Sequence, residues 1–263
     1  MEYPQSPEIK INNLSVEFKT RSGSVPAVRH ASLEIPRNRI TALVGESGSG
    51  KSVTSLAVMD LLPSNGKITD GTIFLDGTEI TSFSHKKRAA LNGSSMGMIF
   101  QSPSDSLDPL YTVGSQITDA IKSHGGVTRR EAHRRAVQCL NAMGLPQPER
   151  IMDMYTFELS GGMCQRVMIA LAMAQKPNYL FADEPTTALD VTVQYQILTE
   201  IYRLNREQNI GVLFITHDLR VVAEIADWVY IMHDGEIVES GDVGHIFRSP
   251  SHPYTQKLLK ALI

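Results

Sequence analysis

The sequence is poor in cysteine, with Cys139 and Cys164 as the two cysteines among its 263 residues. They form no C-x-x-C pair, and no histidine stands near them at the spacing of a metal ligand. A structural zinc or iron–sulfur site built on these thiols is therefore not expected.

Long apolar runs and a secretory leader are also missing. No run approaches the roughly 20 residues that a membrane-crossing helix needs. The start, Met1-Glu2-Tyr3-Pro4-Gln5, has neither a basic segment nor an apolar stretch. We expect a protein that stays in the cytoplasm and touches a membrane only through a partner.

A surplus of positive charge is the third absence. The chain has 25 Lys and Arg against 28 Asp and Glu, a formal net charge of -3. A protein that grips a nucleic-acid backbone normally has a basic surplus, so we expect no nucleic-acid partner. Any anion that this protein holds must be held locally.

The pattern along the chain is that of an α/β protein. Short β-rich runs at 9–18, 31–35 and 40–44 come first, and a helical segment then extends from Gly45 through Leu62. A strand at 72–75 ends in the hairpin turn Asp76-Gly77. The region 85–143 is mostly helical and polar. It contains a strand at 96–100 and charged stretches such as 85–88.

Core strands resume at 179–182 and 212–216, with helices expected at 191–208 and 218–225. Apolar strands that end in polar residues indicate parallel strands whose side chains meet at one edge of a sheet. A last hairpin, 228–232 with 236–239, leads into a short terminal helix. We predict an α/β core with an N-terminal antiparallel β-subdomain and an inserted α-helical subdomain.

One segment fits the phosphate-loop pattern G-x-x-x-x-G-K-[ST] between the strand at 40–44 and a helix that begins near Lys51. Glycines let such a loop wrap so that backbone N–H groups point at phosphate oxygens, and the helix adds its positive dipole end. We expect Lys51 to neutralise the β and γ oxygens and Ser52 to ligate Mg²⁺. A plain Gly/Ser-rich turn is the alternative. The segment comprises Gly45, Glu46, Ser47, Gly48, Ser49, Gly50, Lys51 and Ser52.

Adjacent acids follow the apolar strand at 179–182. Beside a bound nucleotide, Asp183 can hold Mg²⁺ through water, and Glu184 can polarise the water that attacks the γ-phosphorus. The alternative is an acidic helix cap before Pro185. His217 and Gln101 also follow strands. The imidazole can contact the γ-phosphate or orient the water, and the amide oxygen of Gln101 can touch Mg²⁺.

The segment Leu159-Ser160-Gly161-Gly162-Met163 resembles the signature sequence of the ATP-binding-cassette (ABC) family, at the place in the chain where that family has it. Ser160 is expected to cap a helix, and the two glycines bare its first N–H groups as a second anion site. The resemblance implies that two subunits face head-to-tail. Each γ-phosphate is then clamped by the phosphate loop of one subunit and the signature of the other.

Further landmarks of the ABC family fall in order. Gln101 matches the Q-loop, Ala188-Leu189-Asp190 the D-loop and His217 the switch histidine, and Phe18 matches the aromatic that stacks on adenine. The resemblance implies one ABC ATPase domain over 1–263. Its core is expected at about 1–100 and 176–240, its helical subdomain at about 101–175, and a short C-terminal hairpin and helix at 241–263.

A closer resemblance is to the oligopeptide, dipeptide and nickel importer ATPases. It rests on Phe100-Gln101-Ser102-Pro103, the segments 160–170 and 183–194, and His252-Pro253-Tyr254-Thr255. Many peptide-importing relatives continue into a cysteine-bearing tail, whereas this sequence ends at Ile263 without one. That difference favours the nickel or metal-chelate branch over the peptide branch.

The resemblance implies a motor subunit that uses ATP and Mg²⁺ at the cytoplasmic face of the inner membrane. Its partners would be a second ABC ATPase, two multi-span permease subunits and, indirectly, an extracytoplasmic substrate-binding protein. ATP closes the dimer, hydrolysis opens it, and the segment 102–121 transmits the motion to a permease helix. Its apolar residues Leu107, Leu110, Tyr111 and Val113 are expected to be exposed there, or else to form the subdomain core.

Rival functions remain at this stage. One is an ABC ATPase without a transporter, such as a component of a phosphonate-degrading complex or a protein of DNA repair or translation. Another is a P-loop GTPase or kinase, which the missing N-K-x-D motif opposes. A third is a regulatory binding module.

Overall fold

The computed structural model describes residues 8–123, 125–187 and 189–260. The expectations for Met1 to Gln5, for Ala188 of the D-loop and for Ile263 lie outside the described residues. The chain divides into two compact units, one made of Met1–Ala89 and Leu204–Ile263 and the other of Ala90–Arg203.

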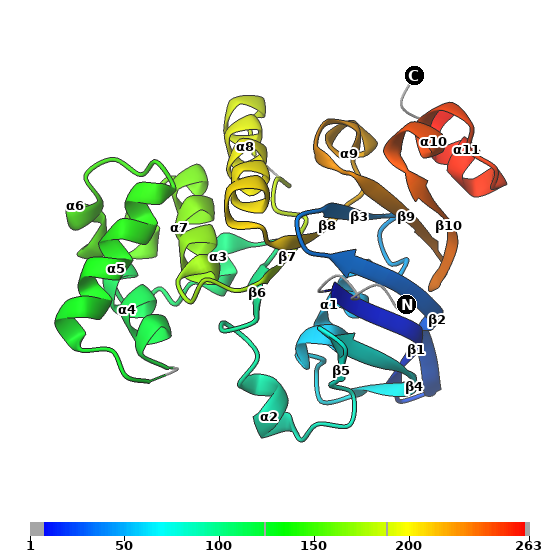
Figure 1. Ribbon diagram of the computed structural model, residues 1–263, viewed down its shortest axis with the longest axis horizontal. Helices are drawn as coiled ribbons and strands as arrows, with labels where there is room; N and C mark the ends of the chain where they lie inside the picture. Colours follow the sequence, from blue (N-terminus) through cyan, green and yellow to red (C-terminus); the bar gives the residue numbers. More distant parts are fainter. Residues whose placement is uncertain (1–7, 124, 188, 261–263) are drawn as a thin grey trace, which may run out of the picture. The chain divides into compact units, whose positions relative to one another are not determined.

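An antiparallel sheet opens the first unit, with strand order β2-β1-β4-β5. A two-residue turn with positive φ at Asp76 (48°) and Gly77 (79°) joins β4 to β5, which fits the twist of a hairpin. One face of β1 is buried through Ile9 and Ile11. These strands, blue to cyan in Figure 1, are β1 (Glu8–Thr20), β2 (Gly23–Pro36), β4 (Gly66–Leu75) and β5 (Thr78–Glu79).

Parallel strands form the centre of the first unit. β3 (Ile40–Val44) pairs in parallel with β8 (Gly211–Thr216) and with β9 (Trp228–His233), and β10 (Glu236–Asp242) returns antiparallel to β9. Every residue of β3 and β8 is buried, which explains their continuous apolar character.

Helices flank these parallel strands. α1 (Lys51–Met59) follows β3, and α2 (His85–Ala89) comes later in the chain. The remaining helices are α9 (Leu219–Ile225), α10 (Val243–Arg248) and α11 (Pro253–Lys260). A single buried cluster includes Val44 of β3, Val222 of α9, Ile246 of α10 and Tyr254 of α11, so the C-terminal helices pack on the parallel strands.

The second unit joins a parallel pair, β6 (Met96–Ile99) with β7 (Tyr179–Asp183), to a group of helices. Figure 1 shows α4, α5, α6 and α7 gathered side by side in green. The helices are α3 (Pro103–Ser106), α4 (Val113–Ser123), α5 (Arg129–Ala142), α6 (Pro148–Met152), α7 (Gly161–Met173) and the first part of α8 (Val191–Gln208), with a 3₁₀ turn at Thr156–Glu158.

One expectation is corrected by this structure, and one pair of alternatives is resolved. The first helix ends at Met59 rather than at Leu62, because Asp60 takes a left-handed conformation (φ 58°) and its N–H bonds back to the carbonyl of Ala57. For the apolar residues of the segment 102–121, which were expected either at the surface or in the subdomain core, the structure separates the two: Leu107 and Val113 are each 1% exposed, whereas Leu110 and Tyr111 are 80% and 56% exposed.

Within the described part of the chain, no helix combines the length and the apolar character needed to cross a membrane.

Candidate functional site

The phosphate loop follows β3 at the point where the strand ends. Gly48 and Gly50 have positive φ angles of 82° and 105°, which a side chain would strain. A Cβ on Gly45 would lie 2.1 Å from the carbonyl oxygen of Met232, and one on Gly50 would lie 2.5 Å from that of Ala27. Neighbouring backbone therefore requires glycine at both ends of the loop.

Lys51 begins α1, and only 5% of its surface is exposed. Its ammonium donates to the carbonyl oxygens of Gly45 (2.9 Å) and Glu46 (2.8 Å), so the side chain folds over the loop. Gly50 is the N-cap of α1 and provides no side-chain cap for the first N–H groups of the helix. Ser52 is the next residue. This arrangement of a bare helix N-terminus and a folded-over cation is suited to an anion with several oxygens.

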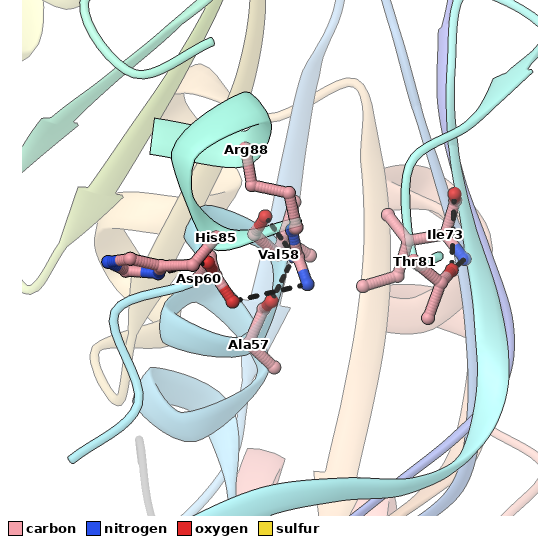
Figure 2. A network of polar contacts seen from close by, with 7 residues as sticks. All are labelled: Ala57, Val58, Asp60, Ile73, Thr81, His85 and Arg88. Carbon is pink, nitrogen blue, oxygen red and sulfur yellow. Dashed lines mark hydrogen bonds and ion pairs between the residues drawn. The ribbon is translucent and has the colours of Figure 1, made fainter. Parts of the chain in front are cut away.

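The opposite end of α1 is fixed by α2, as Figure 2 shows. Arg88 is 4% exposed, and its guanidinium donates to the carbonyls of Ala57 (2.7 Å) and Val58 (2.8 Å). Asp60 lies 3.4 Å from Arg88 and 2.7 Å from the imidazole of His85. Burial lowers the pKa of the Arg88 guanidinium, and the Asp60 carboxylate opposes that effect. A cation at the C-terminal carbonyls stabilises the helix that carries Lys51.

His217 emerges at the same edge of the parallel sheet as the phosphate loop. In the pairing of β3 with β8, Val44 lies opposite Thr216, and the next residues are Gly45 and His217. His217 is exposed. Asp218 follows as the N-cap of α9 and accepts from the N–H of Arg220 at 2.9 Å. The first unit thus brings together the phosphate loop and the predicted switch histidine.

Phe18 lies in the antiparallel sheet of the first unit, where it pairs with Gly66 and is half-buried. A Cβ on Gly66 would lie 2.7 Å from the phenyl ring, so the ring covers this glycine. This contact with the cross-strand glycine gives Phe18 a packing role within the sheet. Stacking on adenine stays a prediction.

The acids form a second cluster, in the second unit, at the ends of β6 and β7. Asp183 is 6% exposed, and Glu184 has a left-handed backbone (φ 46°), which is costly for a residue with a side chain. The Glu184 carboxylate accepts from the amide of Gln101 at 3.2 Å and from the hydroxyl of Thr187 at 2.9 Å. Gln101 and Glu184, both predicted from strand ends, are therefore in direct contact.

Gln165 supports this cluster, although the sequence analysis gave it no role. It is 1% exposed on α7, and its amide donates to the carbonyl of Pro185 at 2.6 Å. The bond holds the turn that follows Glu184. A glutamine among apolar residues on the buried face of a helix is the signal that could have indicated it.

The signature segment forms the N-terminus of α7 in the second unit. The Ser160 hydroxyl accepts from the N–H of Met163 at 3.3 Å, which confirms the predicted cap. A Cβ on Gly161 would meet open space, whereas one on Gly162 would lie 2.8 Å from Val193. Gly161 is therefore accessible to a ligand or partner, and Gly162 allows α7 to approach α8.

The described part of the chain holds no metal site made of protein ligands alone. Among the described residues, no group of three or more His, Cys, Asp and Glu side chains could hold an ion. The predicted ligands Ser52, Gln101 and Asp183 all offer oxygen, the donor type that Mg²⁺ prefers when phosphates and water complete its shell.

Comparison with protein families identifies residues 28–187 as matching the family described as "ABC transporter". The chain is 46% identical over 254 residues to the dipeptide transport ATP-binding protein DppD of Escherichia coli (strain K12), covering 97% of this chain and 78% of that protein. It is 46% identical over 255 residues to the oligopeptide transport ATP-binding protein AppD of Bacillus subtilis (strain 168), with coverages of 97% and 78%.

Solved structures of similar fold include the dimeric post-hydrolysis state of the ATP-binding cassette MJ0796 bound to ADP and Pi. Its TM-score is 0.80 at 27% identity, over 89% of this chain and 98% of that one. The cbiO1 protein of Clostridium perfringens, part of the ABC transporter complex cbiONQ, gives a TM-score of 0.78 at 26% identity, with coverages of 93% and 92%.

Proposed function

Because the chain belongs to the ABC transporter family, in which ATP is bound and hydrolysed to ADP and phosphate, we propose that it is the ATPase subunit of a peptide importer. The observation that carries the proposal is the 46% identity to a dipeptide transport ATP-binding protein over 97% of this chain. The oligopeptide transport protein of Bacillus subtilis supports the same substrate class. The proposed cargo is therefore peptide, and the earlier preference for nickel or metal chelates receives no support from these relatives.

The triphosphate is proposed to bind on the loop from Gly45 to Ser52. Lys51 leaves the carbonyls of Gly45 and Glu46 for the β and γ oxygens, and the N–H groups at the start of α1 donate to the remaining phosphate oxygens. Phe18 is proposed to stack on the adenine. Removal of the Lys51 ammonium then removes most of the affinity for ATP.

Mg²⁺ is proposed to join the nucleotide through the Ser52 hydroxyl, with Asp183 holding it through water and Gln101 offering its amide oxygen. When bound, the ion neutralises charge that develops on the β and γ oxygens. The donors present are all oxygen, so they fit this ion.

Glu184 is proposed to act as the general base. Its carboxylate accepts hydrogen bonds from Gln101 and Thr187, which orient it for taking a proton from water. His217 is proposed to contact the γ-phosphate or orient the water.

The second cassette is proposed to supply its own Ser160, Gly161 and Gly162 to the γ-phosphate. The support is the open space beside Gly161 at a capped helix N-terminus, together with the dimeric MJ0796 cassette. The partner is either a second copy or a paralogue.

A permease subunit is proposed to dock on an aromatic patch made of Leu110, Tyr111, Tyr155 and Phe157. Leu110 is 80% exposed and Phe157 is 73% exposed, which is unusual for large apolar side chains. The rings of Tyr155 and Phe157 stack at a centroid distance of 5.4 Å, and the bridge between Thr112 and Tyr155 brings the segment that carries Leu110 and Tyr111 beside Tyr155. We propose that this docking holds the protein at the cytoplasmic face of the inner membrane, with a substrate-binding protein on the other side.

Reconstitution tests the proposal. The chain is purified with its permeases and second ATPase in lipid vesicles, and ATP hydrolysis is measured with the binding protein and either a dipeptide or a nickel chelate. Stimulation by the peptide is expected. Stimulation by the chelate and not by the peptide would show that the cargo is a metal chelate. Full activity without any permease would favour a transporter-independent ATPase.

A further inference from the structure

The motif His252-Pro253-Tyr254-Thr255 has no part in the chemistry described above, yet it reaches the phosphate loop. Tyr254 lies in the first turn of α11 and is 7% exposed. Its phenol oxygen accepts a hydrogen bond from the backbone N–H of Glu46 at 3.1 Å, although the two residues are 208 positions apart. The C-terminal helix is thus bonded directly to the loop proposed to hold the triphosphate.

The position of the phenol is fixed from several sides. Its ring stacks on the imidazole of His233 at a centroid distance of 3.9 Å and an angle of 22°. The ring also belongs to the buried cluster formed by β3 and the C-terminal helices. Burial raises the pKa of the Tyr254 phenol, so the oxygen stays neutral at physiological pH. This hydroxyl is therefore a stationary hydrogen-bond acceptor.

The entry to α11 is anchored as well. The carboxylate of Glu239 accepts from the N–H groups of Ser251 (2.6 Å) and His252 (3.1 Å). The imidazole of His252 accepts in turn from the N–H of Tyr254 at 3.2 Å. Burial acts to raise the pKa of Glu239, but the nearby Thr255 side chain and the bonds from these N–H groups lower it overall. The charged carboxylate thus holds the motif against β10.

Hydrogen bonds fix Glu46 at both its backbone N–H and its carbonyl. The N–H of Glu46 is held by Tyr254, and its carbonyl accepts from the Lys51 ammonium at 2.8 Å. Further along the loop, the carbonyl of Ser49 accepts from the N–H of Gly235 at 3.0 Å. A triphosphate must draw the Lys51 ammonium away from the carbonyl, whereas the bond to Tyr254 needs no such change.

We infer that Tyr254 is a positioning residue of the ATP site, which keeps the Glu46 peptide in its phosphate-binding conformation when Lys51 turns to the nucleotide. The inference rests on the proposed function of the phosphate loop. Since the conformation of a loop before binding decides how much entropy binding costs, loss of the hydroxyl weakens affinity more than turnover.

Tyr254→Phe tests this, because it removes the oxygen and keeps the ring on His233. Tyr230→Phe is the matched control: Tyr230 accepts from the N–H of Glu34 at the same 3.1 Å, away from the loop. For each purified full-length variant, the Kd for ATP, the KM and kcat of hydrolysis, and the melting temperature are measured. Tyr254→Phe is expected to weaken ATP binding about fivefold and to raise KM similarly, with kcat within about twofold, the effect of one lost hydrogen bond.

A merely structural role would lower the melting temperature of both variants and leave their Kd unchanged, and that result would overturn the inference.

Glu239→Gln is the second variant should Tyr254→Phe fail to fold. It loosens the anchor of α11 and is expected to weaken ATP binding, and an unchanged Kd there overturns the inference too. Lys51→Ala separates the two claims. If Lys51→Ala binds ATP with an unchanged Kd, the proposed site is wrong. If Lys51→Ala loses ATP binding and Tyr254→Phe keeps an unchanged Kd, only the positioning role of Tyr254 is refuted.

Discussion

The Gln101 amide donates to the Glu184 carboxylate at 3.2 Å, and it does so because two parallel strands end side by side. Ile99 of β6 pairs with Ala182 of β7. Gln101 lies two positions after Ile99, and Glu184 lies two positions after Ala182. The left-handed backbone of Glu184 turns the chain out of the strand at this point. A residue proposed to offer its amide oxygen to Mg²⁺ is thereby bonded to the proposed general base.

Glu184→Gln is expected to stop turnover while ATP binding persists. The amide keeps the shape of the side chain but has no basic oxygen to take a proton from water, so kcat is expected to fall roughly 10²- to 10⁴-fold. Steady-state ATPase rates and the Kd for ATP provide the measurement. Glu149→Gln, at an exposed position on α6, is the control and should leave both values unchanged. Normal hydrolysis by Glu184→Gln would remove this residue from the mechanism.

Ser160→Arg is expected to abolish ATPase activity without changing the Kd for ATP of the isolated chain. The long cation would occupy the open space beside Gly161 and would break the cap that Ser160 makes with Met163. The affinity is spared because the proposed partner of this segment is the nucleotide of another subunit. ATP-dependent dimerisation, measured by size-exclusion chromatography in a Glu184→Gln background, should be lost.

Ser123→Arg, at an exposed position near the end of α4, is the control for this charge and should dimerise normally. Loss of ATP binding by the isolated Ser160→Arg chain would contradict the shared site, because the signature segment would then act on the nucleotide of its own subunit.

Leu110→Asp combined with Phe157→Asp is expected to detach the protein from its permeases. Carboxylates in the aromatic patch would have to be desolvated on docking, so co-purification should fall at least tenfold. ATP binding by the free chain should not change, because neither residue belongs to the proposed nucleotide site. Tyr202→Asp, on a side chain that is 45% exposed in α8, is the control. Unaltered co-purification of the double variant would place the docking surface elsewhere.

Local features of the site could be predicted from the sequence because their signals lie within a few residues. The strand before the phosphate loop was expected at 40–44 and is Ile40–Val44, and the helix expected at 191–208 is Val191–Gln208. The Ser160 cap follows from residue type and position alone. The proximity of Gln101 to Glu184 followed from the rule that parallel strands deliver their ends to one edge.

Long-range contacts could not be predicted in this way. Tyr254 and Glu46 are distant in sequence, and a tyrosine near a chain end gives no sign that its hydroxyl reaches a loop. Leu107 and Val113 have the same apolar character as the exposed Leu110, and tertiary packing alone separates them. Arg88 belongs to a charged stretch, 85–88, whose other members are exposed, so composition concealed its burial.

Arg88 yields the last prediction, because a buried guanidinium that satisfies two helix carbonyls should contribute to stability. Arg88→Met keeps the length of the side chain but leaves the carbonyls of Ala57 and Val58 without these donors, and Asp60 without its nearby cation. We expect the free energy of unfolding to fall by about 2–4 kcal/mol. Urea denaturation followed by circular dichroism measures it.

Lys86→Met is the control for this prediction, since it removes a cation from the same helix at an exposed position and should change the free energy of unfolding by less than about 0.5 kcal/mol. Arg88→Lys should recover part of the loss, because one guanidinium nitrogen donates to both carbonyls and an ammonium can replace it, whereas the second nitrogen, which lies 3.4 Å from Asp60, has no counterpart in lysine. Equal stability of Arg88→Met and Lys86→Met would show that the carbonyls at the end of α1 find other donors, and that α2 does not secure the helix that carries Lys51.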